Sequence, residues 1–218
     1  PEFTNWRSEQ RAWRESVALL DQSHHMTDLF IKGPDALKLL SDLGINKFSN
    51  FKPNMAKQFV AVNHEGYLIG DAILVYLEEG LFDLIGWHMV PDWVQYHGEK
   101  GDYDVTFERD ANSAAREGDP LQYRFEVQGP KAELLMEKVS SIPVEKTRFF
   151  GMLEFEIAGR RIRGIRHGMA GQPGFEFWGP WEDYDLIRNT LIEAGEEFDL
   201  KLAGSLAYST ANLESAWV

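Results

Sequence analysis

The sequence predicts an α+β fold built from two related halves, each ordered strand, helix, several strands and helix, with helices on one face of mostly antiparallel sheets. Three observations support this prediction. The chain has 218 residues, 44% hydrophobic and 26% charged, as expected for one or two globular domains. A strand, a Gly-Pro turn and an amphipathic helix occur twice, at 29–40 and 125–136. Strand-like runs and a second helix follow each copy.

The first half, residues 1–108, opens with a helix expected over 9–20, which residues 23–26 join to the first strand. Proline suits the Gly-Pro turn, because its missing N–H needs no partner in the first turn of a helix. The remaining expected elements are the strand–turn–helix at 29–40, strands at 58–63, 70–76 and 80–86, and a helix from Pro91 to about Gly98.

The second half, residues 121–218, repeats this order after an expected linker at 109–120 that is rich in Asp, Ala, Glu and Gly. Chance similarity over a dozen residues is the alternative to a duplication. The two copies agree in residue types, in spacing and in the order of their elements, which favours duplication. The expected elements are the strand–turn–helix at 125–136, strands at 152–158, 160–166 and 174–179, and a helix from Pro180 to Gly195.

Composition excludes several classes of function. Lys and Arg number 22 against 35 Asp and Glu, a formal net charge of −13, which argues against nucleic acid and against a polybasic membrane patch. The absence of cysteine excludes disulfides, thiolate zinc sites, iron–sulfur clusters and a Cys nucleophile. The longest apolar run, 72–77, is far below the ~18 residues of a membrane span. Because the chain begins at Pro1 without Met and ends at Val218, we expect a fragment.

Common catalytic motifs are missing from the sequence. No Gly-x-Gly-x-x-Gly opens a helix, and there is no phosphate loop, Gly-x-Ser-x-Gly or His-Glu-x-x-His. The glycine-dense run 168–174 contains Pro173, and we expect it to be a turn between strands. His24 and His25 are adjacent and cannot share a metal from one strand. The other histidines, at 64, 88, 97 and 167, show no ligand spacing, so no metal site is expected.

Three polar residues stand in unusual surroundings. His25 is either a satisfied structural histidine or an acid/base group near neutral pH. Asp71 lies inside the apolar strand 69–77, and Glu176 inside 175–178, where a carboxylate is costly unless it is paired. Each carboxylate is either functional or an ordinary outward-facing strand residue, and the pattern leaves both interpretations open.

The segments 20–28, 66–71, 171–176 and 212–217, together with the two Gly-Pro turns, resemble the glycine-cleavage T-protein (aminomethyltransferase) superfamily over essentially the whole chain. The phrases at 166–176 and 207–214 most resemble its bacterial tetrahydrofolate-dependent aryl O-demethylases, the vanillate and syringate type. Members of that family continue into further domains. The resemblance therefore implies that the C-terminal domains, and an N-terminal extension, are missing from this chain.

The resemblance implies a folate-binding domain with tetrahydrofolate as cofactor. Glu176 matches the family glutamate that hydrogen-bonds the pterin ring, whose adjacent N–H donors suit a carboxylate. Trp217 resembles an aromatic wall for the cofactor, and Gln128 lies at the second Gly-Pro turn near the same cavity. Asp71 matches an aspartate of a Gly-x-x-x-Asp-Asp strand, although Gly70 replaces the first aspartate here.

Tyr208 is the informative departure from the T-protein pattern, which has an arginine in an Ala-Arg-Asp run where this chain reads Ala207-Tyr208-Ser209. An arginine cannot release a proton at working pH. A tyrosine can, because its pKa of about 10 is close to that of a phenol leaving group, so that proton transfer between the two is nearly balanced. The resemblance therefore implies Tyr208 as the general acid that protonates the departing phenolate, with His25 orienting or polarising it. The alternative is a half-buried core tyrosine.

The substrate is expected to be a small methoxyarene contacted by Trp87 and His88, from the strand around 84–89. That strand has no arginine to bind a benzoate carboxylate. The arginines at 160, 161 and 163 are alternative candidates for binding that carboxylate, although a solvated strand face is the simpler interpretation.

We therefore expect a cytoplasmic enzyme that moves a methyl group from an aryl methyl ether to N5 of tetrahydrofolate. The alternatives are an aminomethyltransferase or another one-carbon transfer on the same fold, and a non-catalytic folate-binding module. No nucleic acid or membrane partner is expected. The sequence gives neither the exact methyl donor nor the oligomeric state, nor whether the fragment alone is active.

Overall fold

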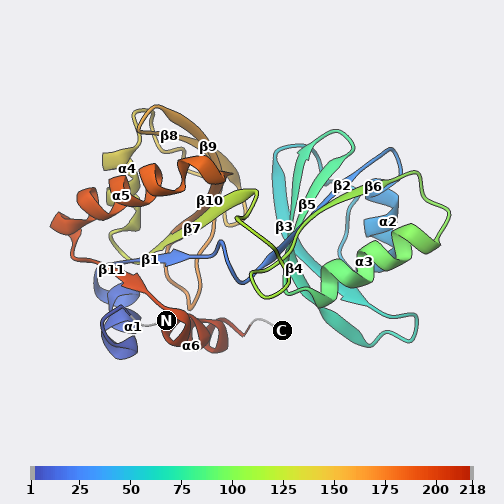
Figure 1. Cartoon of the computed structure of the whole chain (residues 1–218), viewed down its shortest axis with the longest axis horizontal. Helices are drawn as coiled ribbons and strands as arrows, with labels where there is room; N and C mark the ends of the chain where they lie inside the picture. The colour runs from blue at the N-terminus through green and yellow to red at the C-terminus, as the bar shows by residue number, and fades with distance from the viewer. Residues whose placement is uncertain (1–2, 217–218) are drawn as a thin grey trace. The chain divides into compact units, whose positions relative to one another are not determined.

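The computed structural model describes residues 3–216, which form two compact units (Figure 1). Unit 1 consists of residues 3–23 and 121–216, and unit 2 of residues 24–120. The elements of unit 1 are α1 Trp6–Glu15, β1 Val17–Asp21, β7 Gln122–Gln128, α4 Ala132–Val139, β8 Met152–Ile157, β9 Arg160–Arg166, β10 Gly174–Pro180, η1 Trp181–Asp183, α5 Tyr184–Gly195, η2 Glu196–Phe198, β11 Leu200–Ala203 and α6 Ser205–Ser215. Those of unit 2 are β2 Thr27–Lys32, α2 Ala36–Leu43, β3 Met55–Val62, β4 Leu68–Glu78, β5 Leu81–Gly86, α3 Met89–Lys100 and β6 Thr106–Asp110.

Unit 2 is an antiparallel sheet in the order β3-β4-β5-β2-β6. Its core lies between one sheet face and the apolar sides of α2 and α3, where Leu39, Leu40 and Val94 pack against Leu29 and Phe82. Amphipathic helices bury one stripe in this way because the sheet offers the matching apolar surface.

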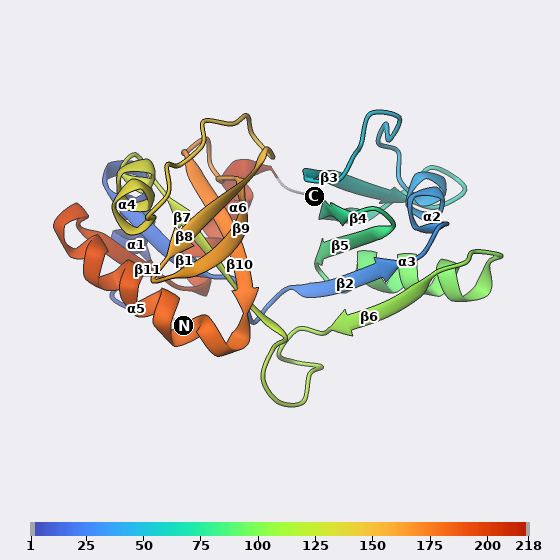
Figure 2. The same ribbon diagram turned by 90° about the horizontal axis from the view of Figure 1, so that it is seen from above.

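Unit 1 is a six-stranded sheet in the order β11-β1-β7-β10-β9-β8, and only the β1–β11 pair is parallel among the strands that the structure describes. Figure 2 shows β8, β9 and β10 as neighbouring strands. One face packs against α4 and α5 through Leu135 and Leu191. The opposite face is covered by α1 and α6, whose Trp13 and Ala207 pack with Leu20 of β1. The sheet is therefore buried on both faces at its β11–β1 end, whereas Glu154 of β8 and Arg163 of β9 are exposed.

The expected repetition of elements is confirmed. The stretch from β2 to β6 and the stretch from β7 to β11 both run strand, helix, three strands, helix, strand. Each Gly-Pro turn requires its glycine. Gly33 and Gly129 have φ of +149° and +131°, and a Cβ on Gly129 would lie 2.6 Å from the carbonyl oxygen of Ser16. The motif that marked the repeat thus has a backbone cause.

Three expected boundaries differ from those of the structure. The helix expected over 9–20 is α1 followed by β1, because Asn5 caps the helix early and the run 17–20 is buried between β7 and β11. A short apolar run cannot be assigned to helix or strand by periodicity alone. For the same reason the first half does not begin at residue 1, since β1 pairs within the sheet of unit 1. The expected linker 109–120 also begins too early, as Arg109 and Asp110 still pair with β2.

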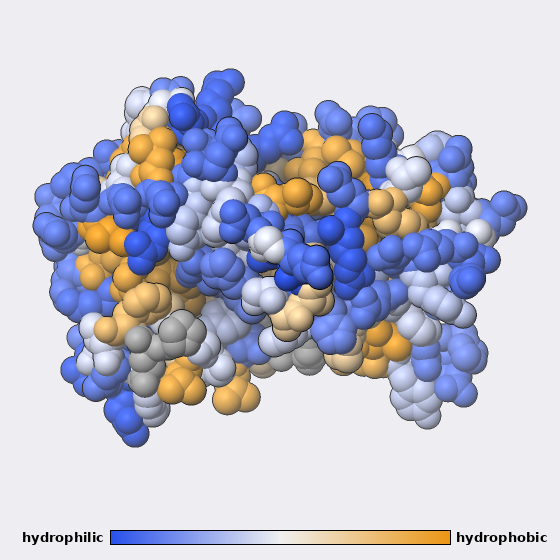
Figure 3. Space-filling model, in the orientation of Figure 1, coloured by the Kyte–Doolittle hydropathy of each residue, from blue (hydrophilic) through white to orange (hydrophobic). Residues whose placement is uncertain are grey.

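Hydrophilic residues dominate the face of the molecule shown in Figure 3, with hydrophobic residues in scattered groups. None of the helices within residues 3–216 combines the length and the apolar character that crossing a lipid bilayer requires.

Glu9 joins α1 to the start of α6. This fully buried carboxylate accepts hydrogen bonds from the backbone N–H groups of Phe3, Thr4 and Gly204, at 2.7, 2.8 and 2.8 Å. Burial raises the pKa of Glu9, but these donors outweigh burial and lower it below its ordinary value. The charge of Glu9 therefore holds together the two helices that cover one face of the sheet.

Glu9→Gln should destabilise unit 1 by about 1–3 kcal/mol at pH 7, because an amide replaces the anion that the backbone donors surround. Urea unfolding followed by tryptophan fluorescence measures the difference. Since the folded-state pKa of Glu9 is lowered, the difference should be present above about pH 4.5 and shrink as the pH falls further. The control, Glu15→Gln on the exposed side of α1, should change stability by less than about 0.5 kcal/mol. Equal losses in both variants would contradict this role.

Candidate functional site

A row of polar side chains lies on the face of the unit 1 sheet that α1 and α6 cover. Alternation along β7 places Arg124, Glu126 and Gln128 on this face, while Tyr123, Phe125 and Val127 enter the opposite core. The antiparallel register with β10 pairs Glu126 with Glu176 and Arg124 with Trp178. Two carboxylates and a guanidinium are thereby placed side by side.

All of these polar residues are buried. Arg124 donates from Nη1 to Glu176 Oε1 at 3.0 Å, and both side chains are at most 2% exposed. The guanidinium also lies 4.8 Å from the centre of the Trp178 ring. Gln22, which follows β1, donates from Nε2 to Glu126 Oε2 at 2.9 Å. Glu176 is thus paired with a cation, whereas Glu126 is paired with a neutral amide.

This difference gives the two glutamates different electrostatic surroundings. Burial, and then the neighbouring Glu176 charge, raise the pKa of Glu126 to about 8, and the Gln22 hydrogen bond only partly opposes them. Burial, together with Arg124, lowers the pKa of His167, although Glu176 acts in the opposite direction. At neutral pH the cluster therefore holds a protonated Glu126 and an uncharged His167 beside the Arg124–Glu176 ion pair.

Buried atoms of Gln22, Glu126 and Gln128 are available to a ligand. Among the residues that the structure describes, Gln22 Oε1, Glu126 Oε1 and Gln128 Nε2 have no hydrogen-bond partner. Gln128 uses its other amide atom, because Oε1 accepts from the backbone N–H of Met169 at 2.8 Å. That bond fixes the glycine-dense run 168–174, which was expected to be a turn between strands and joins β9 to β10. Buried polar atoms without partners are costly, so their presence indicates a binding site.

The spacing of the cluster raises the question of a metal. One ligand atom from each of Glu126, His167 and Glu176 lies within 4.8 Å of the others. Arg124, however, already supplies the positive charge next to Glu176, and a divalent cation would face that guanidinium. The expectation of no metal site stays a prediction.

The structure brings three of the sequence-predicted residues together in unit 1. Glu176 and Gln128 belong to the polar row. Tyr208 lies on α6, half-buried, and packs against the cluster that contains Leu20 and Met169 on the same side of the sheet. Their predicted roles stay predictions. Trp217, the predicted aromatic wall, lies outside the described residues.

The other four predicted residues belong to unit 2. His25 lies in the turn after unit 1 ends, and its ring meets Trp87 edge-on at 6.3 Å between centroids. Trp87 is 60% exposed. His88 Nδ1 lies 2.9 Å from Asp92 Oδ2, and Asp71 accepts from Gln58 Nε2 at 2.7 Å. Burial raises the pKa of Asp71 despite that hydrogen bond.

The cooperation predicted between His25 and Tyr208 joins residues of different units and stays a prediction. The three arginines that were considered as an alternative binding site for a substrate carboxylate lie on β9. Arg160 donates from Nε to Asp183 at 2.8 Å, and Arg161 and Arg163 are exposed. These three arginines are thus a solvated face, on which Arg160 pairs with Asp183 and Arg161 with Glu154.

Sequence reasoning missed Gln22, Arg124, Glu126 and His167. Arg124 and Glu126 alternate with apolar residues in β7, and such a pattern ordinarily indicates a solvent-facing side. The available signal was that Gln128 and Glu126 lie on the same face of one strand. Recognising the site also required knowing that β10 pairs with β7 in this register.

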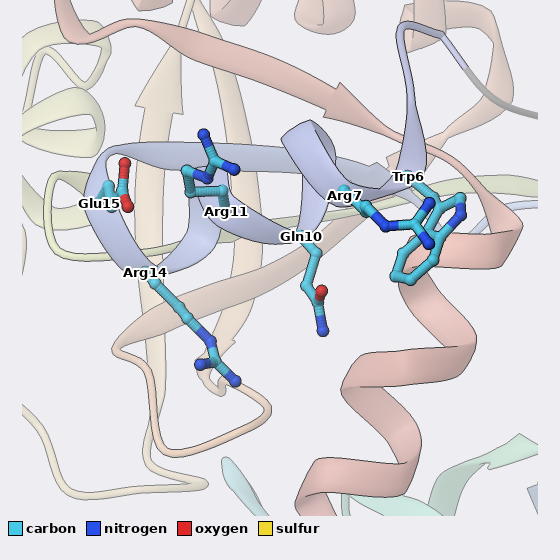
Figure 4. Close-up of a pocket in the computed structure, with 6 residues that line it drawn as sticks. All are labelled: Trp6, Arg7, Gln10, Arg11, Arg14 and Glu15. Atoms are coloured by element: carbon cyan, nitrogen blue, oxygen red, sulfur yellow. The ribbon is translucent and has the colours of Figure 1, made fainter.

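The structure also has an open cavity of about 410 Å³ along α1, lined by Trp6, Arg7, Gln10, Arg11, Arg14 and Glu15 (Figure 4). All six side chains come from one helix, and none is a predicted site residue. Arg7 stacks on the Trp6 ring at 4.1 Å, and Arg14 forms an ion pair with Glu214 of α6. This cavity is a groove beside the helix rather than part of the buried cluster.

Comparison with known proteins places the chain in a family. The structure resembles the solved glycine cleavage system aminomethyltransferase T from Bartonella henselae, with a TM-score of 0.77 at 20% identity over 98% of this chain and 55% of that one. Residues 2–218 match the model of the GCVT N-terminal domain, and the chain belongs to that family.

Relatives by sequence include two kinds of enzyme. The chain is 45% identical over 218 residues to a syringate O-demethylase of a Sphingobium species, covering all of this chain and 47% of that protein. It is 28% identical over 217 residues to an aminomethyltransferase of Caldanaerobacter subterraneus, covering 98% of this chain and 56% of that protein. The chain thus spans about half the length of these relatives, and the family resemblance seen in the sequence is confirmed.

Arg124→Met should destabilise unit 1 by about 3–5 kcal/mol, because it leaves the buried Glu176 charge without its cation. Adding Glu176→Gln to that variant should recover part of the loss, since the uncompensated charge is removed. Arg163→Met, on the exposed side of β9, is the matched control and should cost less than about 0.5 kcal/mol. Urea unfolding measures all four proteins. A cost at Arg124 no larger than at Arg163 would contradict the importance of the ion pair.

Proposed function

We propose that this chain is the folate-binding part of an enzyme that transfers a methyl group from an aryl methyl ether to N5 of tetrahydrofolate. The observation that carries the proposal is the buried Glu176, held by Arg124 beside Glu126 Oε1 and Gln128 Nε2, which lack partners within residues 3–216. Membership of the GCVT N-terminal domain family and the 45% identity to a syringate O-demethylase support the substrate class.

The buried cluster suits the pterin part of the cofactor. Glu176 would accept hydrogen bonds from the adjacent pterin N–H groups, and the Nε2 atom of Gln128 is a donor without a partner among the described residues. Asp71 and Trp217 are the further predicted contacts. When bound, the folate supplies the nucleophilic N5 that accepts the methyl group.

Tyr208 is proposed as the general acid. During transfer the methyl carbon–oxygen bond of the ether breaks and the N5–carbon bond forms, so the aryl oxygen gains a proton and N5 loses one. Tyr208 would give its phenolic proton to the developing phenolate and recover one from N5 through solvent or His25. Its half-buried position on α6, beside the apolar cluster with Met169, limits competing water.

The substrate side is proposed to involve Trp87 and His88. The exposed Trp87 ring offers an apolar face to a methoxyarene, and His25 meets it edge-on. His88 is positioned by Asp92 at the start of α3. A small-molecule partner and a cytoplasmic location follow from the same proposal.

An assay of methyl transfer tests the function. The protein, in its full natural length, is mixed with tetrahydrofolate and methoxybenzoates such as vanillate or syringate, under an oxygen-free atmosphere. Formation of 5-methyltetrahydrofolate and the demethylated phenol is the expected result. Transfer only from an aminomethyl donor would support the aminomethyltransferase alternative, favoured by the 28% identical relative. Folate binding with no transfer from any donor would support the non-catalytic module.

Tyr208→Phe should lower kcat for demethylation by about 10²–10⁴-fold, because the phenolate would leave without its proton donor. Tetrahydrofolate affinity should stay within threefold of wild type, roughly 0.6 kcal/mol. Ser209→Ala, at the exposed neighbouring position of α6, is the control and should leave kcat unchanged. Full activity in the Phe variant would exclude Tyr208 as the acid while leaving the enzyme class intact.

A further inference from the structure

The buried cluster contains a second glutamate, Glu126, to which the proposed function gives no role. Glu126 is fully buried, its Cα is directly opposite that of Glu176 in the β7–β10 register, and carboxylate oxygens of the two residues lie within 4.8 Å. Two buried carboxylates at this separation do not both keep a charge. Within residues 3–216 Arg124 forms its ion pair with Glu176 rather than with Glu126, so Glu176 keeps the charge and Glu126 the proton.

The position of that proton follows from the hydrogen bonds of Glu126. Its Oε2 already accepts from Gln22 Nε2 at 2.9 Å, and its Oε1 has no partner within residues 3–216. A carboxylic acid has one O–H donor, and Oε1 is the oxygen free to carry it. Glu126 therefore presents a donor from Oε1, while Glu176 presents acceptor oxygens next to it.

The pterin edge has a matching order of groups. Its amino and N3–H donors lie between two acceptors, the ring nitrogen N1 and the carbonyl O4. A carboxylate alone satisfies only the two donors. The flanking acceptors need donors, and the cluster offers two that lack partners among the described residues, Gln128 Nε2 and the Glu126 acid.

We propose that Glu126 is a second pterin-recognition residue, which donates from Oε1 as the neutral acid while Glu176 accepts as the anion. This inference rests on the proposed folate function and deepens it. It makes cofactor affinity depend on pH, since an ionised Glu126 has no proton to donate. The charged or titratable groups around Glu126 are Glu176 on β10, Arg124 on β7 itself and His167 after β9.

The inference is tested by calorimetry of tetrahydrofolate binding under an oxygen-free atmosphere, from pH 6.5 to 9, on the full natural chain. With the pKa of Glu126 at about 8, wild-type affinity should fall about tenfold between pH 7 and pH 9. Near pH 8.5, titrations in two buffers of different ionisation enthalpy should show proton uptake on binding.

Glu126→Gln keeps a donor that does not titrate. It should bind within threefold of wild type at pH 7, lose the pH dependence between pH 7 and 9, and take up no proton. Glu126→Leu removes the donor and should bind about tenfold more weakly at pH 7. Glu154→Gln, an exposed glutamate on β8, is the matched control and should reproduce the wild-type curve.

The outcomes separate the two proposals. If wild type does not bind tetrahydrofolate at any pH, the proposed function fails, and the role of Glu126 fails with it. If wild type binds but Glu126→Gln keeps the same pH dependence and proton uptake, the role of Glu126 is wrong and the folate function stands. Titration of tetrahydrofolate itself would affect wild type and Glu126→Gln equally, so it cannot produce the expected difference between their pH dependences.

Discussion

The buried ion pair between Arg124 and Glu176 is the interaction on which the chemistry of unit 1 depends. It fixes where the negative charge resides in a cluster that contains two glutamates. Taking both charges out of water is costly, and the pair contributes less net stability than its geometry suggests. Its consequence is an asymmetry: the carboxyl beside the guanidinium is ionised, and Glu126, opposite it on β7, is not. One residue type thus supplies both an acceptor and a donor, through environment alone.

The chain topology makes this arrangement possible. Because β1 returns the N-terminal segment into the sheet beside β7, Gln22 reaches Glu126 and occupies one of its oxygens. The helices α1 and α6 pack on the same face of the sheet, against β1 and Met169, and Glu9 joins them through the backbone N–H of Gly204. The side chains of the polar row are buried, which raises the strength of the electrostatic interactions among them.

Much of the fold was predictable, because the Gly-Pro turns and the alternating strands are local signals. The two glycines with positive φ and the strands at 152–158 and 160–166 were identified from their own residues. The run 17–20 was misassigned, since its strand form depends on distant β7 and β11. The roles of Glu176 and Gln128 were inferred from family resemblance, whereas Arg124 and Glu126 look like solvent-facing residues until the pairing of β7 with β10 is known. Long-range pairing, rather than any local pattern, assembles the site.

The central claim is that the cluster holds a neutral Glu126 beside an ionised Glu176, and a carboxyl titration tests it most directly. The protein, labelled with ¹³C in its glutamate side chains, is titrated by NMR, and the Glu126→Gln spectrum assigns the Glu126 resonance. This resonance is expected to titrate with a pKa of about 8. A Glu126 resonance that titrates near the ordinary glutamate value, about 4.3, would contradict it.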